Sequence, residues 1–287
     1  MPSPPAPVLV LASVASVQFG QAVGKQLFGH VGPLGVVSLR LGFAAAILLL
    51  AYRPSLPRSR SELALVFGFG TAIAGMNLIY PALRYLPLGL ATSLQLLGPI
   101  TLALLMSRRA LDLAAAVLAG AGVWLFHAPA GVDVPVAGVL LALCSGVAMA
   151  TYLLMSSRAG AGSADGSPLA LAVAWAAVLT VPFGVAESGT ALFAPHAVVV
   201  GLAVAVMSAV VPYSLELVAL RRLPPRTVGV LQSLEPAAAG IAGTVVLGEM
   251  LTGPQWVALG CVCAAGCGAV VPRKAGRRFE NEVPTSG

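Results

Sequence analysis

Apolar residues occur along this chain in runs of about twenty, separated by short polar or basic connectors. A helix of about twenty residues spans the ~30 Å hydrocarbon core of a bilayer, so each run predicts a transmembrane helix. The predicted fold class is therefore an all-α integral membrane protein. The pattern predicts ten transmembrane helices, at residues 8–28, 33–52, 63–83, 88–107, 112–128, 134–155, 168–187, 196–219, 227–247 and 254–272.

Composition supports this fold class. Of the 287 residues, 58% are hydrophobic and 9% are charged, and the mean hydropathy is +0.94. Water-soluble domains carry about 25% charged residues, so this chain has too few to cover a soluble surface. The four cysteines lie inside apolar runs, where a thiol packs as a small hydrophobe, and we expect neither a disulfide nor a zinc site.

The basic residues predict how the chain is oriented in the membrane. Thirteen of the sixteen Lys and Arg fall in alternate connectors, and short connectors rich in these residues stay cytoplasmic. Both termini are therefore expected in the cytoplasm. The same topology explains the net charge of +6, so we expect no nucleic-acid partner. The residues expected at the outer face are His30, His127, His196, Asp133, Glu187 and Glu249.

The chain contains a duplicated segment. Residues 82–99 align with residues 219–236 at a constant offset of 137, and nine of the eighteen positions are identical. Five predicted helices separate the copies, and an odd number reverses the direction of every equivalent helix. We therefore expect two inverted five-helix repeats, residues 1–130 and 131–272, followed by a polar cytoplasmic tail at 273–287. Inverted repeats are typical of secondary transporters, whose substrate site lies near the membrane midplane.

Two charged residues fall deep inside predicted helices, where an ionisable group normally faces a protein-lined cavity. Glu235 lies about eight residues, or ~12 Å, into the ninth helix and is followed by the helix-breaking Pro236. It predicts a substrate or proton-coupling site, or alternatively a structural hydrogen bond. Arg40 lies about seven residues, or ~10 Å, into the second helix. It either binds a substrate carboxylate as a fork or pairs with an acid such as Glu235.

Other polar residues extend this candidate site. Glu216 lies about one turn from Arg221, which favours an interfacial salt bridge, with gating or proton relay as the alternative. Lys25 can reach the outer interface by snorkelling, again with proton coupling or gating as the alternative. Uncharged candidates for a polar path, each of which can instead join helices by hydrogen bonds, are Gln18, Asn77, Tyr80, Gln95, Tyr152 and Gln232.

The sequence lacks the motifs of the common catalytic sites. It has no Gly-rich phosphate loop, no His/Glu pair at metal-binding spacing and no acidic cluster for magnesium-dependent transfer. We therefore expect no cofactor and no metal. An integral-membrane enzyme is the less favoured alternative to a transporter.

Several segments resemble a known family. Residues 234–236 (LEP) and 247–252 (LGEMLT) resemble the drug/metabolite transporter superfamily with EamA-like repeats. Residues 33–40, 75–77, 86–89, 107–109, 212–216 and 223–227 are similar to a branch that exports small neutral amino acids, such as threonine and homoserine, across the bacterial inner membrane. The resemblance covers nearly the whole chain. Gln95 stands where we would expect glutamate in that branch, a difference that bears on substrate range or coupling.

The resemblance implies a secondary active efflux transporter of the bacterial inner membrane that works by proton antiport and alternating access. Its expected partners are protons, the lipid bilayer and a small zwitterionic substrate. In this hypothesis Arg40 attracts the substrate carboxylate, and Glu235 attracts the ammonium group or the exchanged proton. Export of drugs, nucleobases or other small metabolites is the alternative within the superfamily.

Overall fold

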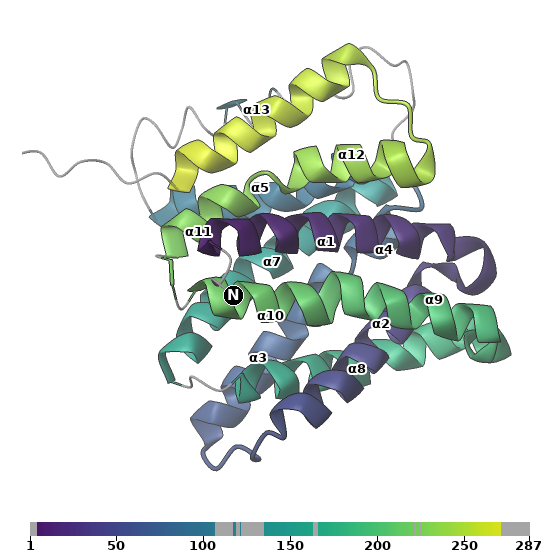
Figure 1. Ribbon diagram of the computed structural model, residues 1–287, viewed down its shortest axis with the longest axis vertical. Coiled ribbons are helices and arrows are strands. Elements are labelled where there is room, and N and C mark those ends of the chain that lie inside the picture. Colours follow the sequence, from purple (N-terminus) through teal and green to yellow (C-terminus); the bar gives the residue numbers. More distant parts are fainter. Residues whose placement is uncertain are drawn as a thin grey trace, which may run out of the picture.

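The computed structural model describes residues 5–106, 117–118, 121, 135–162, 166–220, 222–223 and 225–270. Every regular element in these residues is a helix (Figure 1). Among the described residues, seven helical stretches are long and apolar enough to cross a membrane, and Leu88–Leu102 is a shorter apolar helix. The chain is a multi-pass membrane protein, as its apolar runs predict. The helix predicted at 112–128 lies almost wholly outside the described residues.

The helices match the predicted spans closely in position. They are α1 (Ala6–Gln26), α2 (Phe28–Tyr52), α3 (Arg60–Met76), α4 (Ile79–Ala82), α5 (Leu88–Met106), α7 (Val136–Gly162), α8 (Ser167–Ser188), α9 (Pro195–Ala205), α10 (Val211–Leu220), α11 (Pro225–Gln232), α12 (Glu235–Leu247) and α13 (Gly253–Val270). A 3-10 segment, η1 (Gly189–Phe193), joins α8 to α9, and a π-helical segment, η2 (Val206–Val210), joins α9 to α10.

Two of the predicted spans are interrupted by turns. The span predicted at 63–83 consists of α3 and α4, with a turn at residues 77–78, and the span at 227–247 consists of α11 and α12, with a turn at residues 233–234. Pro236 follows the second turn and cannot donate a backbone hydrogen bond to the carbonyl four residues earlier. In a membrane protein, such breaks are tolerated where the freed backbone groups face protein or a cavity.

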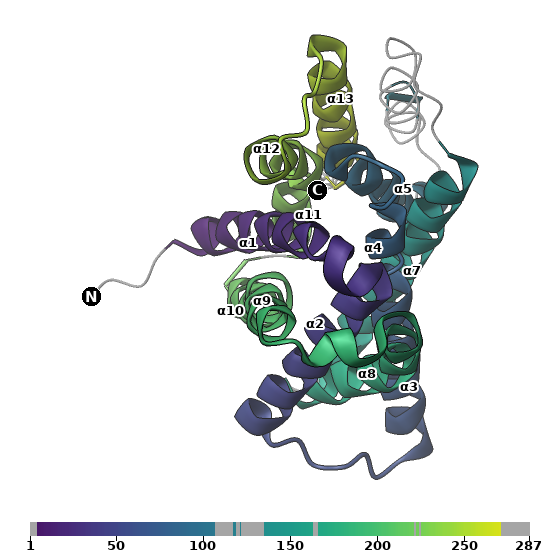
Figure 2. The same ribbon diagram turned by 90° about the vertical axis from the view of Figure 1, so that its right-hand side faces the viewer.

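Eight of the helices form a closed circuit of neighbours. It runs from α1 to α12, α5, α7, α3, α8, α2 and α9, and then back to α1. Figures 1 and 2 show α1 lying between α12 and the α9–α10 helix, with α2, α3 and α8 grouped together beyond α9–α10. Each neighbouring pair in the circuit joins a helix before residue 107 to a helix after residue 134. The two parts of the sequence are therefore interleaved rather than packed as two separate bundles.

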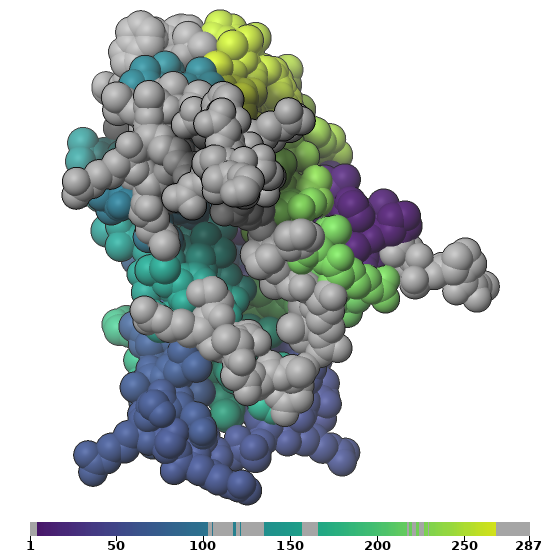
Figure 3. Space-filling model, turned by 90° about the vertical axis from the view of Figure 1, so that its left-hand side faces the viewer, coloured from purple at the N-terminus to yellow at the C-terminus, as the bar shows by residue number. Residues whose placement is uncertain are grey.

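The bundle has two ends. At one end, on the right of Figure 1, α1 passes into α2 and α12 leads toward α13; we call this the carboxylate end, because Glu187 and Glu249 form their contacts there. Figure 3 looks onto the opposite end, where α1 begins and the α2–α3 connection (blue) forms the lower edge. Apolar side chains exposed along the helices, including Leu50, Val147 and Phe183, suit a surface in contact with lipid.

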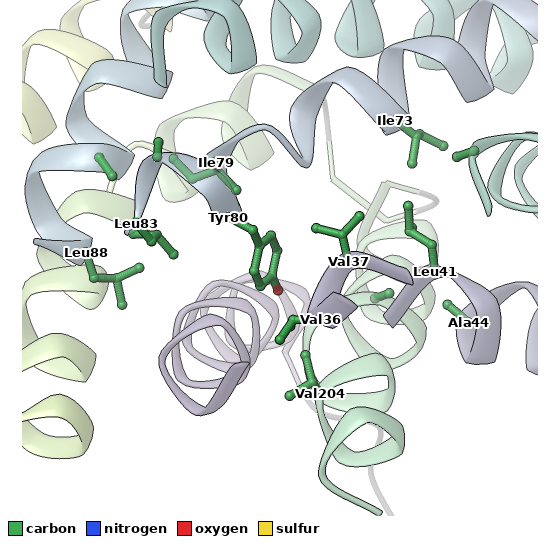
Figure 4. Packing of buried hydrophobic residues seen from close by; sticks show 14 of the residues in the cluster. Val36, Val37, Leu41, Ala44, Ile73, Ile79, Tyr80, Leu83, Leu88 and Val204 are labelled. Atoms are coloured by element: carbon green, nitrogen blue, oxygen red, sulfur yellow. The ribbon is translucent and has the colours of Figure 1, made fainter. Parts of the chain in front are cut away.

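The hydrophobic core lies inside the circuit and surrounds α4. Tyr80, Leu83 and Ile73 are fully buried in one cluster, and Tyr80 extends toward Val36 of α2 and Val204 of α9 (Figure 4). Small residues allow the helices to approach: a Cβ at Gly98 of α5 would overlap the backbone of Gly146 in α7. The core therefore fixes α4 and the broken helices at the centre of the molecule.

Candidate functional site

A cavity lies between the broken helices at the centre of the bundle. Its empty volume is about 710 Å³, counting the part that opens toward solvent. Four of the predicted site residues reach it from the first part of the chain: Arg40, Asn77, Tyr80 and Gln95. Four more reach it from the second part: Tyr152, Glu216, Gln232 and Glu235.

Arg40 of α2 is held in place on one side of this cavity. Its side chain is buried, with 4% of the residue surface exposed. Nε donates to the Ser208 hydroxyl at 2.7 Å, Nη2 donates to the Ser208 carbonyl oxygen at 2.7 Å, and Nη1 donates to Asn77 Oδ1 at 2.5 Å. Asn77 is itself oriented by a 2.7 Å hydrogen bond from its Nδ2 to the Ile73 carbonyl. These hydrogen bonds therefore hold the Arg40 guanidinium in one orientation.

The Ser208 carbonyl lacks its α-helical donor, because Pro212 stands four residues later. In a helix this carbonyl would accept from the backbone N–H four residues later, and proline has none. Ser208 lies in the π-helical segment η2, a distortion that often occurs at functional sites. The resulting free acceptor takes a hydrogen bond from the Arg40 guanidinium. A break in α9–α10 thus positions a charge on α2.

Arg40 keeps capacity for a ligand. A guanidinium has five N–H donors, and three are used by Ser208 and Asn77, which leaves one on each terminal nitrogen. The described residues contain two ion pairs, and Arg40 takes part in neither. The pairing of Arg40 with Glu235, one of the two sequence-based alternatives, is therefore not found. The Tyr80 ring lies 5.7 Å from the guanidinium carbon and shields it on one face.

Two carboxyl groups occupy another part of the cavity lining. Glu235 is the first residue of α12, directly after the turn at residues 233–234, and Glu216 lies on α10. The two are close enough to interact electrostatically, and Gln232 lies within hydrogen-bonding reach of Glu216. Arg221, the partner predicted for Glu216 from the sequence, lies outside the described residues. Glu216 instead lines the same cavity as Glu235.

Tyrosines lie between the cationic and acidic parts of the cavity. Tyr213 of α10 has both Arg40 and Glu216 as electrostatic neighbours, and Tyr152 of α7 has Glu216 and Glu235. The Tyr152 and Tyr213 rings are stacked, with centroids 6.5 Å apart. The cavity therefore presents a cation, an aromatic section and two acids in that order.

Gln95 both lines the cavity and joins three helices. Its Nε2 donates to the Ser145 hydroxyl at 2.6 Å and to the Met76 carbonyl at 3.3 Å, and Ser145 also donates to the Met76 carbonyl. Pro99 leaves the Gln95 carbonyl without its helical donor. Gln232, which aligns with Gln95 at the offset of 137, also lines the cavity and is followed four residues later by Pro236. Equivalent positions of the repeated sequence thus meet at one site.

Sequence reasoning did not single out Gln21 and Ser208, which also line the cavity. Ser208 has a signal in the sequence, since it lies four residues before Pro212 within an apolar run and is expected to have a free carbonyl. Gln21 has a weaker one, as a polar residue in an apolar helix. Gln18, one turn earlier on α1, was predicted as a candidate, but it is not part of the cavity lining.

Lys25 lies away from the cavity, at the carboxylate end. Its Nζ forms a 2.7 Å ion pair with Glu249 Oε1 and donates to the Leu86 carbonyl at 3.1 Å. The other Glu249 oxygen accepts from the Leu88 N–H at 2.9 Å, the first N–H of α5. One carboxylate therefore ties the end of α1 and the start of α5 to the chain between α12 and α13. A proton-coupling or gating role for Lys25 stays a prediction.

Glu187 forms a second contact of the same kind. Gly32 has φ +67° and Pro33 follows it, so the long part of α2 begins with free N–H groups. Glu187 Oε2 accepts from two of them, on Leu34 at 2.7 Å and Gly35 at 3.2 Å. A carboxylate at a helix N-terminus is favourable for the helix dipole. Both Glu187 and Glu249, from the second part of the chain, thus cap helices of the first.

Comparisons with known proteins agree with this architecture. The EamA-like transporter family matches residues 136–270. The Threonine/homoserine exporter RhtA of Escherichia coli (strain K12) is 42% identical over 270 residues, which cover 92% of this chain and 90% of that protein. RhtA of Salmonella typhimurium (strain LT2) is 42% identical over 274 residues, 92% of this chain and 91% of its own.

Two more distant similarities extend the comparison. The Uncharacterized transporter YwfM of Bacillus subtilis (strain 168) is 29% identical over 146 residues, 50% of this chain and 49% of its own. A solved crystal structure with 17% sequence identity superimposes with a TM-score of 0.61 over 92% of this chain and 97% of its own. The chain therefore shares its overall fold with a protein of known structure.

Proposed function

Because the chain belongs to the EamA-like transporter family, we propose that it is a secondary active exporter of small neutral amino acids, with threonine and homoserine as its first candidate substrates. Its relatives are named transporters, and the chain is a transporter rather than an enzyme. Two of the relatives carry threonine and homoserine in their names. The proposal locates the substrate in the central cavity.

The arrangement of charge around the cavity is the observation that supports this substrate class. A neutral amino acid carries a carboxylate and an ammonium group. Arg40 has two N–H donors that Ser208 and Asn77 do not take, in a geometry suited to a carboxylate. Glu235 and Glu216 offer acceptors for the ammonium group elsewhere in the same lining. A zwitterion bound in this direction would compensate both the buried cation and the acids.

The paired acids support proton antiport. Two carboxylates facing one cavity within a membrane are costly to keep ionised unless a cation lies beside them. The substrate ammonium supplies that cation when the substrate is bound. When the substrate has left, a proton taken up by Glu235 or Glu216 replaces it. Ammonium and proton would then compete for the same carboxylates, which couples export of one to import of the other.

We further infer ten transmembrane helices in two inverted repeats, residues 1–130 and 131–272, with a cytoplasmic tail at 273–287 and both termini in the cytoplasm of a bacterium. The interleaved helix circuit and the presence of Gln95 and Gln232 in one cavity lining support this arrangement. The carboxylate end then faces away from the cytoplasm. Glu187 and Glu249 would hold that side closed, and alternating access would require both contacts to release.

Transport assays in proteoliposomes test the proposal. Counterflow of labelled threonine or homoserine is expected in the wild type and is expected to be lost in Glu235→Gln. Arg40→Ala is expected to raise KM about 100-fold, since charge-assisted hydrogen bonds contribute ~1.5–3 kcal/mol each. Arg60→Ala and Glu62→Gln are matched controls, because both residues are exposed and neither lines the cavity.

Unchanged transport in both Glu235→Gln and Arg40→Ala would refute the roles assigned to these two residues. Transport of drugs or nucleobases that excess threonine does not inhibit would favour the alternative substrate class. Counterflow of threonine that is unaffected by an imposed pH gradient would contradict proton antiport while leaving the substrate class intact.

A further inference from the structure

Three buried polar groups of the cavity have no hydrogen-bond partner among the residues that the structure describes. They are the Tyr80 hydroxyl, the Tyr213 hydroxyl and Gln21 Oε1, on residues with 1%, 8% and 7% of their surface exposed. Buried polar atoms of folded proteins are almost always hydrogen-bonded, to protein or to a molecule that enters the site. All three line the cavity, so whatever occupies it can supply the missing partner.

These groups lie around Arg40 rather than at the acids. The Tyr80 ring is 5.7 Å from the guanidinium carbon. Tyr213 lies beside the guanidinium, although its hydroxyl has no hydrogen bond of normal geometry. Figure 4 shows Tyr80 extending from α4 toward Val36 of α2. Both phenols therefore flank the place where the substrate carboxylate would bind.

Gln21 approaches the same region from α1. Gly24, one turn further along α1, is in contact with the Tyr80 ring, because a Cβ at that position would stand 3.1 Å from Tyr80 Cε1. Residues three apart share one face of a helix, so Gln21 and Gly24 face the same neighbours. The three groups thus come from α1, α4 and α10 and converge beside α2.

The chemistry of the three groups selects one kind of ligand atom. A phenol hydroxyl both donates and accepts, whereas Gln21 Oε1 only accepts. A carboxylate can accept from the phenols but has no hydrogen for Gln21, and an ammonium has hydrogens but cannot accept. A hydroxyl does both: it accepts from a phenol and donates to the amide oxygen. The one group that can both accept from a phenol and donate to Gln21 is therefore an alcohol close to the carboxylate.

The geometry points to a hydroxyl subsite, formed by Gln21, Tyr80 and Tyr213, that recognises the side-chain alcohol of the amino acid held by Arg40. This inference rests on the proposed function and adds the substrate group that is recognised, the side-chain hydroxyl. The alcohol of threonine is on the carbon next to the α-carbon, and that of homoserine is one carbon further, so both stay near the carboxylate. Amino acids of equal size without the alcohol leave the three groups unpaired and are disfavoured.

Competition against labelled threonine in proteoliposomes tests the subsite. The competitors are unlabelled threonine and 2-aminobutyrate, which differ only in the hydroxyl. The wild type is expected to prefer threonine by at least tenfold. Tyr213→Phe and Gln21→Met are each expected to bring the preference close to one by weakening threonine, with 2-aminobutyrate unchanged. Tyr85→Phe is the matched control, because Tyr85 is 45% exposed and lies outside the cavity lining.

Each outcome decides the question. Retained inhibition by 2-aminobutyrate shows that a variant is folded. Because Tyr213 and Gln21 lie on different helices, one variant still tests the subsite if the other does not fold. An equal weakening of both competitors would overturn the subsite, since it would mean that the phenols bind the carboxylate. An unchanged preference would also overturn it, since water would then satisfy these groups. A wild type that transports no amino acid would instead refute the proposed function, and the subsite with it.

Discussion

Replacing Pro212 by alanine is expected to change helix stability and substrate affinity in opposite directions. The substitution returns a backbone N–H to position 212, where the Ser208 carbonyl four residues earlier is the normal helical acceptor. That carbonyl now accepts from Arg40 Nη2 at 2.7 Å. In Pro212→Ala the restored N–H would draw this carbonyl toward the helix axis and so weaken its hydrogen bond from the guanidinium. The variant is expected to have a more regular helix and a less well-positioned arginine.

The magnitudes of the effect on helix stability and the effect on substrate affinity can both be estimated. Proline inside a helix is ~3 kcal/mol less favourable than alanine, of which a π-distorted helix recovers part. The variant should therefore be at least as heat-stable as the wild type. Loss of one hydrogen bond to a charged group costs ~1.5–3 kcal/mol, and Arg40 retains the Ser208 hydroxyl and Asn77. The expected rise in KM is therefore near the lower limit, about tenfold.

Thermal unfolding in detergent and threonine counterflow in proteoliposomes measure the two effects on the same preparation. Pro182→Ala is the matched control, because Pro182 lies inside α8, is exposed and does not line the cavity. It is expected to preserve KM. A wild-type KM in Pro212→Ala would show that the freed carbonyl does not position Arg40. A large loss of heat stability would show instead that Pro212 is needed for packing.

Three further predictions follow from contacts of the same bundle. Ser208→Ala removes the acceptor of Nε and is expected to raise KM about tenfold, whereas Ser208→Thr keeps a hydroxyl and most of the affinity; equal KM values would contradict this. Lys25→Ala and Glu249→Ala, alone and combined, are expected to show a coupling of ~1–2 kcal/mol in the free energy of unfolding; additive losses would mean that the partly buried pair contributes nothing. Gly98→Ala is expected to lower the free energy of unfolding by ~1–3 kcal/mol, because the added methyl group overlaps α7. Gly253 has open space around it, so Gly253→Ala is expected to be neutral, and a neutral Gly98→Ala would mean that α5 and α7 can separate.

The membrane class and the positions of the helices could be predicted because they depend on local properties of the chain. A run of twenty apolar residues cannot be exposed to water, so its length and spacing determine where a span begins and ends. The cost of a charge in hydrocarbon similarly identified Arg40 and Glu235 as candidates for a polar interior. In the structure both line one cavity, together with five of the six uncharged candidates, Gln18 being the exception. The roles assigned to them stay predictions.

The partners of these residues were decided only by the tertiary structure. Arg40 is bonded to Ser208, 168 positions away, and Glu187 caps a helix 153 positions away. Such contacts depend on how each helix is rotated about its axis and on which helices are neighbours. An almost uniformly apolar helix has no amphipathic pattern that encodes its rotation. The interleaved order of the helices, the carbonyl that Pro212 leaves free for Arg40 and the convergence of Gln21, Tyr80 and Tyr213 therefore emerged only once the helices had packed.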